Sequence, residues 1–182
     1  MDTAKKAREV LASAELLCSA DEVAAAVTRL AGEIAERLGD AHPVLMPVMN
    51  GAVVFAGQLM PQLRFPLEQD FIHATRYGNT TSGGTLQWLV EPAAANVTGR
   101  TVLVLDDILD EGITLAAIRD RLLERGAAAC YTAVLVDKDI GRSRPVTADF
   151  VGLRLPNRYL FGFGMDVNGA WRNLPALYAL KE

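Results

Sequence analysis

The sequence predicts an α/β protein with a mainly parallel β-sheet flanked by helices, and two observations carry this prediction. In the second half of the chain, apolar runs typical of buried strands lie at residues 101–105 and 129–136, on either side of an amphipathic segment at 114–125. In the first half, an amphipathic helix is followed by another short apolar strand. Near-continuous apolar strands that alternate with helices indicate a parallel sheet covered on both faces.

The first predicted helix begins after Ser19 and ends at Gly39. Ser19 and Glu22 have the spacing of a capping box, and apolar side chains recur at helical spacing at Val23, Val27, Leu30, Ile34 and Leu38. A buried strand is predicted next at residues 44–48, and after a turn a second apolar helix is predicted at about 52–63.

The remaining extended runs are short and are predicted at residues 66–76, 85–90, 149–155 and 159–163. Residues 77–84 are different, because they are polar, rich in glycine and without periodicity. Two interpretations of this segment stay open. It is an ordinary hairpin connection, which loop-length statistics favour, or it is a lid with Tyr77 at its base.

Length and composition limit the possible classes of protein. The chain has 182 residues, 51% of them hydrophobic, and a net charge of -4, which indicate one soluble globular domain and disfavour broad nucleic-acid binding. Cys18 and Cys130 lack metal-binding spacing. The first residues have no apolar signal region, and the most apolar window, 44–57, is too short to span a membrane. We therefore expect a cytoplasmic protein without a membrane partner.

Three carboxylates lie between a predicted strand and a predicted helix, at Asp106, Asp107 and Asp110. In open α/β sheets, ligands bind beyond the carboxyl ends of the strands, so these side chains are expected in a cleft. The turn at residues 111–114 would present backbone N–H groups and the Thr114 hydroxyl at a helix N-terminus, which suits a phosphate group.

Adjacent carboxylates at a strand end have several interpretations. The interpretation as the Walker B acid of a nucleoside triphosphatase is disfavoured, because no GxxxxGK[ST] loop occurs in the chain. A receiver domain would need a lysine near a later strand end, and Lys138 is available. A DDxxD metal clamp fits the spacing, but such clamps lie on helices, whereas an apolar β run precedes these acids. A merely solvated acidic loop is disfavoured because the carboxylates would repel one another.

The run DDILDEGIT at residues 106–114, after an apolar strand, resembles the phosphoribosyl pyrophosphate motif of the type I phosphoribosyltransferases. Other segments resemble the same family in the same order, from the pyrophosphate loop to the C-terminal hood, at residues 49–52, 70–78, 135–138, 159–166 and 171–175. The resemblance covers about residues 44–175 and is closer to the hypoxanthine-guanine branch than to the adenine or orotate branches.

This resemblance implies the type I phosphoribosyltransferase fold over residues 1–182 as a single domain. The core would take about residues 40–150, and a small hood would come from about 1–20 and 151–182. The implied activity is purine salvage, in which Mg²⁺-dependent transfer of 5-phosphoribosyl from phosphoribosyl pyrophosphate to hypoxanthine or guanine gives IMP or GMP and pyrophosphate. A non-catalytic nucleotide-sensing regulator on the same fold is the alternative. The family resemblance also favours a homodimer or homotetramer.

The resemblance assigns roles to individual residues in this sequence. Asp106 and Asp107 would hold the ribose hydroxyls, directly or through water bound to Mg²⁺, and Asp166 would be a second metal ligand. Asp110 would accept the purine proton as general base. The 5-phosphate would be wrapped by the main-chain amides of Glu111, Gly112, Ile113 and Thr114 and by the Thr114 hydroxyl.

The other implied contacts concern the base and the leaving group. Lys138 would select a 6-oxo group because an ammonium only donates hydrogen bonds, although a solvated lysine at a strand end is the commoner case. Tyr159 would stack on the purine, or it is an ordinary strand residue. The base edge would be read near Leu160 and Asp166, and pyrophosphate would contact Arg172, Tyr77, Asn50 and Gly51.

Four positions depart from the family pattern, and one of them is Arg76, which stands just before Tyr77 where a serine is common. Many relatives have a small hydroxyl residue at Glu111, a basic or polar residue at Ile113 and a basic residue at Asn50. These departures weaken side-chain contact with phosphate but leave a backbone amide cradle possible. A cis peptide bond is expected between Met49 and Asn50, as in the family.

Overall fold

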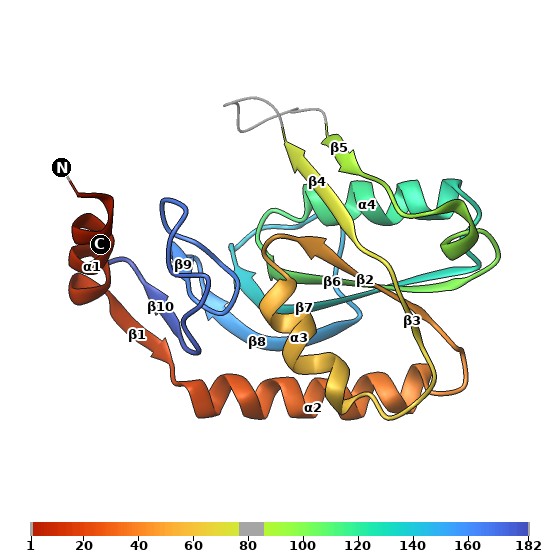
Figure 1. Ribbon diagram of the computed structural model, residues 1–182, viewed down its shortest axis with the longest axis horizontal. Coiled ribbons are helices and arrows are strands. Elements are labelled where there is room, and N and C mark those ends of the chain that lie inside the picture. Colours follow the sequence, from red (N-terminus) through yellow and green to blue (C-terminus); the bar gives the residue numbers. More distant parts are fainter. Residues whose placement is uncertain (1, 77–85, 182) are drawn as a thin grey trace.

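A mostly parallel sheet forms the body of the molecule in the computed structural model, which describes residues 2–76 and 86–181. Its strand order is β5-β4-β2-β6-β7-β8, with β3 paired to β2, and only β5 runs antiparallel to its neighbour (Figure 1). The strands are β2 (Val44–Met49), β3 (Glu68–Gln69), β4 (Ile72–Arg76), β5 (Leu86–Val90), β6 (Thr101–Leu109), β7 (Ala129–Asp139) and β8 (Phe150–Pro156).

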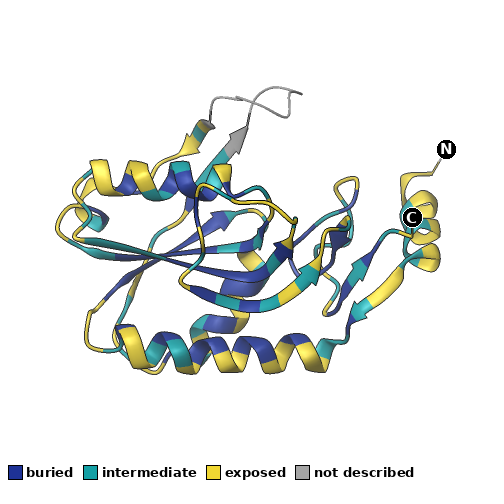
Figure 2. Ribbon diagram, turned by 180° about the vertical axis from the view of Figure 1, so that it is seen from behind, coloured by how far each residue is buried: buried dark blue, intermediate teal, exposed yellow. Residues whose placement is uncertain are grey.

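Helices cover both faces of this sheet. The helices α2 (Ala20–Leu38) and α3 (Val53–Leu59) lie on one face, and α4 (Ile113–Glu124) lies on the other (Figure 1). The capping box at Ser19 is present, since the Ser19 hydroxyl accepts from the backbone N–H of Glu22. Each face has its own apolar core, and the strands between them are buried (Figure 2). The α/β prediction is confirmed.

A second, smaller sheet stands at one end of the main sheet, and we call it the hood. It joins β1 (Glu15–Cys18), β10 (Leu177–Ala179) and β9 (Leu160–Phe161), all antiparallel. The helix α1 (Thr3–Ser13) lies beside it, so both chain ends meet at this end of the molecule (Figure 1). Trp171 donates from its indole N–H to the carbonyl of Ala7 at 2.7 Å, which fastens α1 to the C-terminal segment.

Some element boundaries differ from those expected from the sequence. The strand β6 continues to Leu109 rather than ending at residue 105, because residues 106, 108 and 109 still pair with β7. The predicted helix at 52–63 divides into α3 and the short 3₁₀ helix Met60–Gln62, with Pro61 in its first turn. The main sheet extends through β8 to Pro156, beyond the expected core boundary at about 150.

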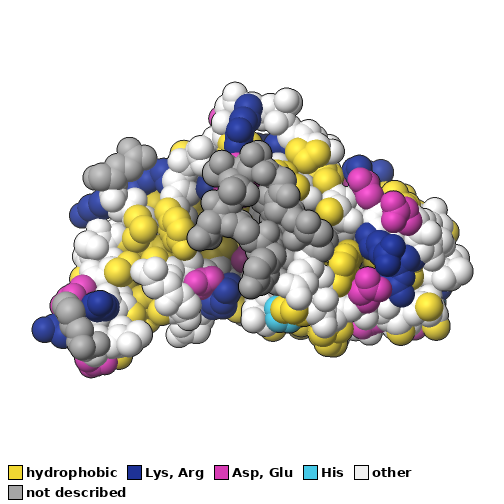
Figure 3. Space-filling model, turned by 90° about the horizontal axis from the view of Figure 1, so that it is seen from above, with side chains coloured by type: hydrophobic (Ala, Val, Ile, Leu, Met, Phe, Trp, Pro, Cys, Tyr) yellow, Lys and Arg dark blue, Asp and Glu magenta, His cyan; other side chains and the backbone are white. Residues whose placement is uncertain are grey.

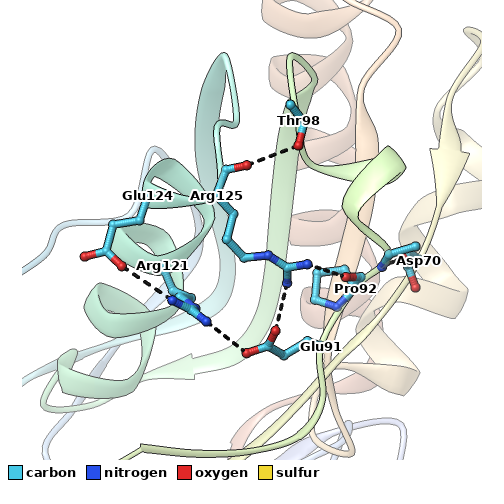
Figure 4. Close-up of polar contacts among 8 residues, drawn as sticks. Asp70, Glu91, Pro92, Thr98, Arg121, Glu124 and Arg125 are labelled. Atoms are coloured by element: carbon cyan, nitrogen blue, oxygen red, sulfur yellow. Dashed lines mark hydrogen bonds and ion pairs between the residues drawn. The ribbon is translucent and has the colours of Figure 1, made fainter.

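Ion pairs tie the end of β5 to the C-terminal end of α4 (Figure 4). Glu91 contacts both Arg125, at 3.1 Å, and Arg121, at 3.6 Å. The Arg125 guanidinium also donates to the carbonyl of Pro92 at 3.1 Å, and Thr98 donates to the Arg125 carbonyl at 3.2 Å.

On the face shown in Figure 3, cationic and anionic side chains are interspersed rather than gathered into one patch.

No helix in the described part of the chain is both long and apolar enough to cross a bilayer.

Candidate active site

Two adjoining cavities lie where β2, β6 and β7 reach their carboxyl ends. Because these strands are parallel and neighbours, the polar residues that end them converge at one edge of the sheet. The larger cavity measures about 520 Å³ and the smaller about 210 Å³. Both are lined by Asp107, Ile108, Asp110 and Arg172, so the two cavities share one wall.

The larger cavity combines carboxylates with the start of a helix. Asp106 and Asp107 line it from β6, and residues 111–114 line it from the turn into α4. The residue before α4 is Gly112, which has a φ of +77° and gives no side-chain cap to the helix. The first N–H groups of α4 therefore have no capping side chain, and the turn that precedes them lines the larger cavity, an arrangement that suits an anion.

Two glycines allow the hood to approach β6 closely. A Cβ atom at Gly51 would lie 2.1 Å from the Asp107 carboxylate, so a larger residue there would displace that side chain. A Cβ atom at Gly164, which has a φ of +104°, would lie 2.0 Å from the Gly51 carbonyl oxygen. The backbone at Gly164 therefore packs directly against the backbone at Gly51, which in turn packs against the Asp107 side chain. The peptide bond between Met49 and Asn50 is cis, as expected.

The smaller cavity lies between the sheet and the hood, and its lining is mixed. Lys138 is only 8% exposed and its ammonium lies 2.9 Å from the Asp110 carboxylate, so it is not a solvated lysine at a strand end. On the hood side the cavity is lined by Tyr159, Leu160 and Met165. The Tyr159 hydroxyl donates to the carbonyl of Asp166 at 3.2 Å. An aromatic ring, a buried cation and apolar side chains suit a flat heterocycle with an acceptor atom.

Asp166 and Arg172 form an ion pair within residues 162–176, the segment that joins β9 to β10 in the hood. Their carboxylate and guanidinium groups lie 2.5 Å apart, and the backbone N–H of Gly169 also donates to Asp166 at 2.7 Å. Arg172 further donates to the carbonyl of Gly164 at 2.6 Å. Arg172 therefore links Asp166 to Gly164, the residue whose backbone packs against Gly51. It also borders both cavities.

The electrostatics of the larger cavity favour a cation or hydroxyl donors beside the paired acids. Burial and the neighbouring Asp107 charge raise the pKa of Asp106 well above its usual range, and burial raises the pKa of Asp107. Two adjacent carboxylates with raised pKa values are costly when both are ionised.

We expect Asp106→Asn to stabilise the ligand-free protein at pH 7. The substitution removes one charge from the pair, and a gain of about 1 kcal/mol would raise the melting temperature by about 2–4 °C. Because the pKa of Asp106 is higher in the folded state than in the unfolded state, folding favours the protonated carboxyl. The free energy of unfolding of the wild type should therefore rise as the pH falls. Melting temperatures of both proteins between pH 5 and pH 8 test this. A variant that melts below the wild type at pH 7 contradicts it.

The structure brings together nearly all residues that the sequence singled out. Around the larger cavity are Asn50, Gly51, Asp106 and residues 111–114; around the smaller are Lys138, Tyr159, Leu160 and Asp166; Asp107, Asp110 and Arg172 border both. Tyr77 lies outside the described residues. Glu111, a departure from the family pattern, forms an ion pair with Arg142 at 2.5 Å. Sequence reasoning missed Gly164, Met165 and Arg142. Gly164 and Met165 lie within residues 159–166, the run whose resemblance to the family's hood could have indicated them.

Comparisons with known proteins agree with this geometry. A family model described as "Phosphoribosyl transferase domain" matches residues 17–168. A hypoxanthine-guanine-xanthine phosphoribosyltransferase of Tritrichomonas foetus is 37% identical over 92% of this chain and 91% of the relative. A hypoxanthine-guanine phosphoribosyltransferase of Bacillus subtilis is 32% identical over 92% and 93%. A crystal structure of a Bacillus anthracis hypoxanthine-guanine phosphoribosyltransferase superimposes with a TM-score of 0.86 at 31% identity, covering 92% of this chain and 98% of that one.

Proposed function

Because this chain belongs to the phosphoribosyltransferase family, we propose that it transfers 5-phosphoribosyl from phosphoribosyl pyrophosphate to hypoxanthine or guanine. The products are IMP or GMP and pyrophosphate, which is a purine-salvage reaction. One observation carries the proposal. A polar cavity with a helix N-terminus and paired acids adjoins a smaller cavity with Lys138 and Tyr159, and Asp110 borders both.

The larger cavity suits phosphoribosyl pyrophosphate. Its volume of about 520 Å³ is within the range of small-ligand sites. The 5-phosphate would be held by the backbone N–H groups of Glu111, Gly112 and Ile113 and by the hydroxyl of Thr114. When ionised, the carboxylates of Asp106 and Asp107 can only accept hydrogen bonds, which matches the two ribose hydroxyls as donors.

The acids also suit Mg²⁺. Among residues 2–76 and 86–181, no group of three or more Asp, Glu, His or Cys side chains could hold a metal by itself. Mg²⁺ is usually bound by one or two carboxylates together with substrate phosphates, so it does not need such a group. Asp106 and Asp107, which line the larger cavity, and separately Asp166, which lines the smaller one, are the proposed protein ligands. When bound, the ion neutralises charge on the pyrophosphate.

The smaller cavity suits a 6-oxopurine. The Lys138 ammonium has three donors, so it can contact Asp110 and still donate to the 6-oxo oxygen, whereas the 6-amino group of adenine offers only donors there. The Tyr159 ring would stack on the purine, and backbone groups near Leu160 and Asp166 would read the opposite edge.

In the reaction, the bond from the anomeric carbon to the pyrophosphate oxygen breaks, and a bond from the same carbon to a purine nitrogen forms. The purine nitrogen loses a proton, and Asp110 accepts it as general base. Asp110 is suited to this role because its carboxylate is half exposed, borders both cavities and contacts Lys138.

Developing charges need opposite partners in the transition state. The ribose becomes cationic, as in glycoside cleavage, and the carboxylates of Asp106 and Asp107 stabilise it. The leaving pyrophosphate becomes more anionic, and Arg172 contacts it together with the backbone at Asn50 and Gly51. Tyr77 is proposed to close over the pyrophosphate.

We also propose that the protein works in the cytoplasm as a homodimer or homotetramer, without a nucleic-acid partner. The oligomer rests on the family. A nucleotide-sensing regulator without catalysis is not favoured, because the relatives that match are named as transferases.

Nucleotide formation tests the proposed function. With phosphoribosyl pyrophosphate, Mg²⁺ and hypoxanthine, the protein should form IMP and an equal amount of pyrophosphate, and chelation of Mg²⁺ should stop both. If neither IMP from hypoxanthine nor GMP from guanine is formed, the proposal is overturned.

A further inference from the structure

Residues 140–146, which follow β7, contact both parts of the candidate site; we call them the β7 connection. The Arg144 side chain is only 12% exposed, and its guanidinium donates to two groups on β7. Nη1 donates to the Asp137 carboxylate, and Nη2 donates to the backbone carbonyl of Lys138. A planar guanidinium reaches both acceptors at once, which a single ammonium cannot do with the same geometry.

Lys138 is held from two sides as a result. Its ammonium contacts Asp110 at 2.9 Å in the smaller cavity, and its carbonyl accepts from Arg144 on the other side of the chain. Arg144 does not line the smaller cavity, so it does not touch a ligand there. Its contact with the carbonyl fixes the backbone from which the Lys138 side chain extends.

The same connection also supports the turn at residues 111–114. Arg142 forms the ion pair with Glu111 at 2.5 Å. A Cβ atom placed at Gly112 would lie 3.1 Å from a Val146 methyl group and 3.6 Å from the Arg144 Cβ atom. The turn that lines the larger cavity therefore packs directly against the β7 connection.

We infer that Arg144 is a positioning residue for the purine subsite, because it sets the backbone of Lys138 from the β7 connection. This inference rests on the proposed function and deepens it. Arg144 lines neither of the two cavities of the candidate site, but a shift of about 1 Å in a positioned group can cost about 100-fold in rate. Hydrogen bonds to charged groups are strong enough that losing one would weaken binding of the base about tenfold.

Arg144→Lys is the test variant, since it keeps the charge and most of the volume but loses the fork. We expect the KM for hypoxanthine to rise about tenfold, while the KM for phosphoribosyl pyrophosphate changes less than about twofold. IMP binding, measured by calorimetry without turnover, should weaken by a similar factor. A merely structural defect would raise both KM values together or lower the melting temperature without this split.

The chain offers a matched control on the same carboxylate. Arg154 also approaches Asp137, with its Nε atom 3.7 Å from the carboxylate, but its side chain is 79% exposed and does not reach the Lys138 carbonyl. Arg154→Lys should leave both KM values and IMP binding unchanged, because exposed ion pairs contribute little.

The outcomes separate the two claims. If Arg144→Lys has the wild-type KM for hypoxanthine and the wild-type affinity for IMP, or if Arg154→Lys has the same effect, the positioning role is overturned and the proposed function stands. If the wild type neither forms nor binds IMP, the proposed function fails and this inference fails with it.

Discussion

Replacing Asp110 by Asn should lower kcat for IMP formation by about 10²–10⁴-fold, the contribution typical of a general base. The amide cannot accept the purine proton, but it keeps the size of the side chain and can accept a hydrogen bond from the nearby Lys138 ammonium. We therefore expect affinity for IMP to change much less than kcat. Steady-state rates and calorimetric IMP binding measure the two effects separately.

Asp120→Asn is the matched control for this variant. Asp120 is on α4, its side chain is 61% exposed, and its partner is Arg119 at 3.3 Å, so the same chemical change occurs away from both cavities. It should have the kcat of the wild type. An Asp110→Asn protein that turns over hypoxanthine at the wild-type rate would remove Asp110 from the role of base.

Replacing Gly164 by Ala should damage both stability and activity. The added Cβ atom would lie 2.0 Å from the Gly51 carbonyl oxygen, which is backbone and cannot rotate away, and the φ of +104° disfavours any side chain. Overpacking together with backbone strain should cost about 2–4 kcal/mol. We expect the melting temperature to fall by about 10 °C. Activity should fall as well, because the hood would move away from Asp107 and Gly51.

Gly169→Ala separates strain from close packing. Gly169 also has a positive φ, +79°, but a Cβ atom there would meet nothing within 4 Å. Its cost should be limited to backbone strain, about 1–2 kcal/mol. Thermal unfolding of the two variants and their kcat values make the comparison. Equal losses in both would contradict a specific contact between the hood and the pyrophosphate loop.

The main sheet could be predicted well because its signals are local. The capping box at Ser19 and the helical spacing that follows predict α2, whose bounds are Ala20–Leu38. The apolar runs for β6 and β7 are equally direct, since strands buried on both faces need apolar side chains throughout.

The hood was harder to predict in detail because its strands are short and pair over long sequence distances. The predicted strand at 159–163 is limited to β9, because Gly162 and Phe163 have positive φ values and turn the chain. The pairing of β1 with β10 joins residues near opposite ends of the chain, and no local pattern indicates it.

The candidate site shows the same division. The acids and the phosphate turn are contiguous in sequence, so the motif at 106–114 locates them together. The contacts of Arg144 with Lys138 and of Arg142 with Glu111 depend on how the β7 connection folds back. The spacing of these charged residues in the sequence is the same as would be expected for solvent-exposed side chains without such contacts.

The most direct measurement of the central claim is a competition among bases. The wild-type protein, with Mg²⁺ and phosphoribosyl pyrophosphate, is supplied with equal concentrations of hypoxanthine, guanine, xanthine and adenine, and the nucleotides formed are separated and quantified. Because Lys138 only donates hydrogen bonds, IMP or GMP should form and AMP should not. Formation of AMP alone, or of no nucleotide, would contradict the account.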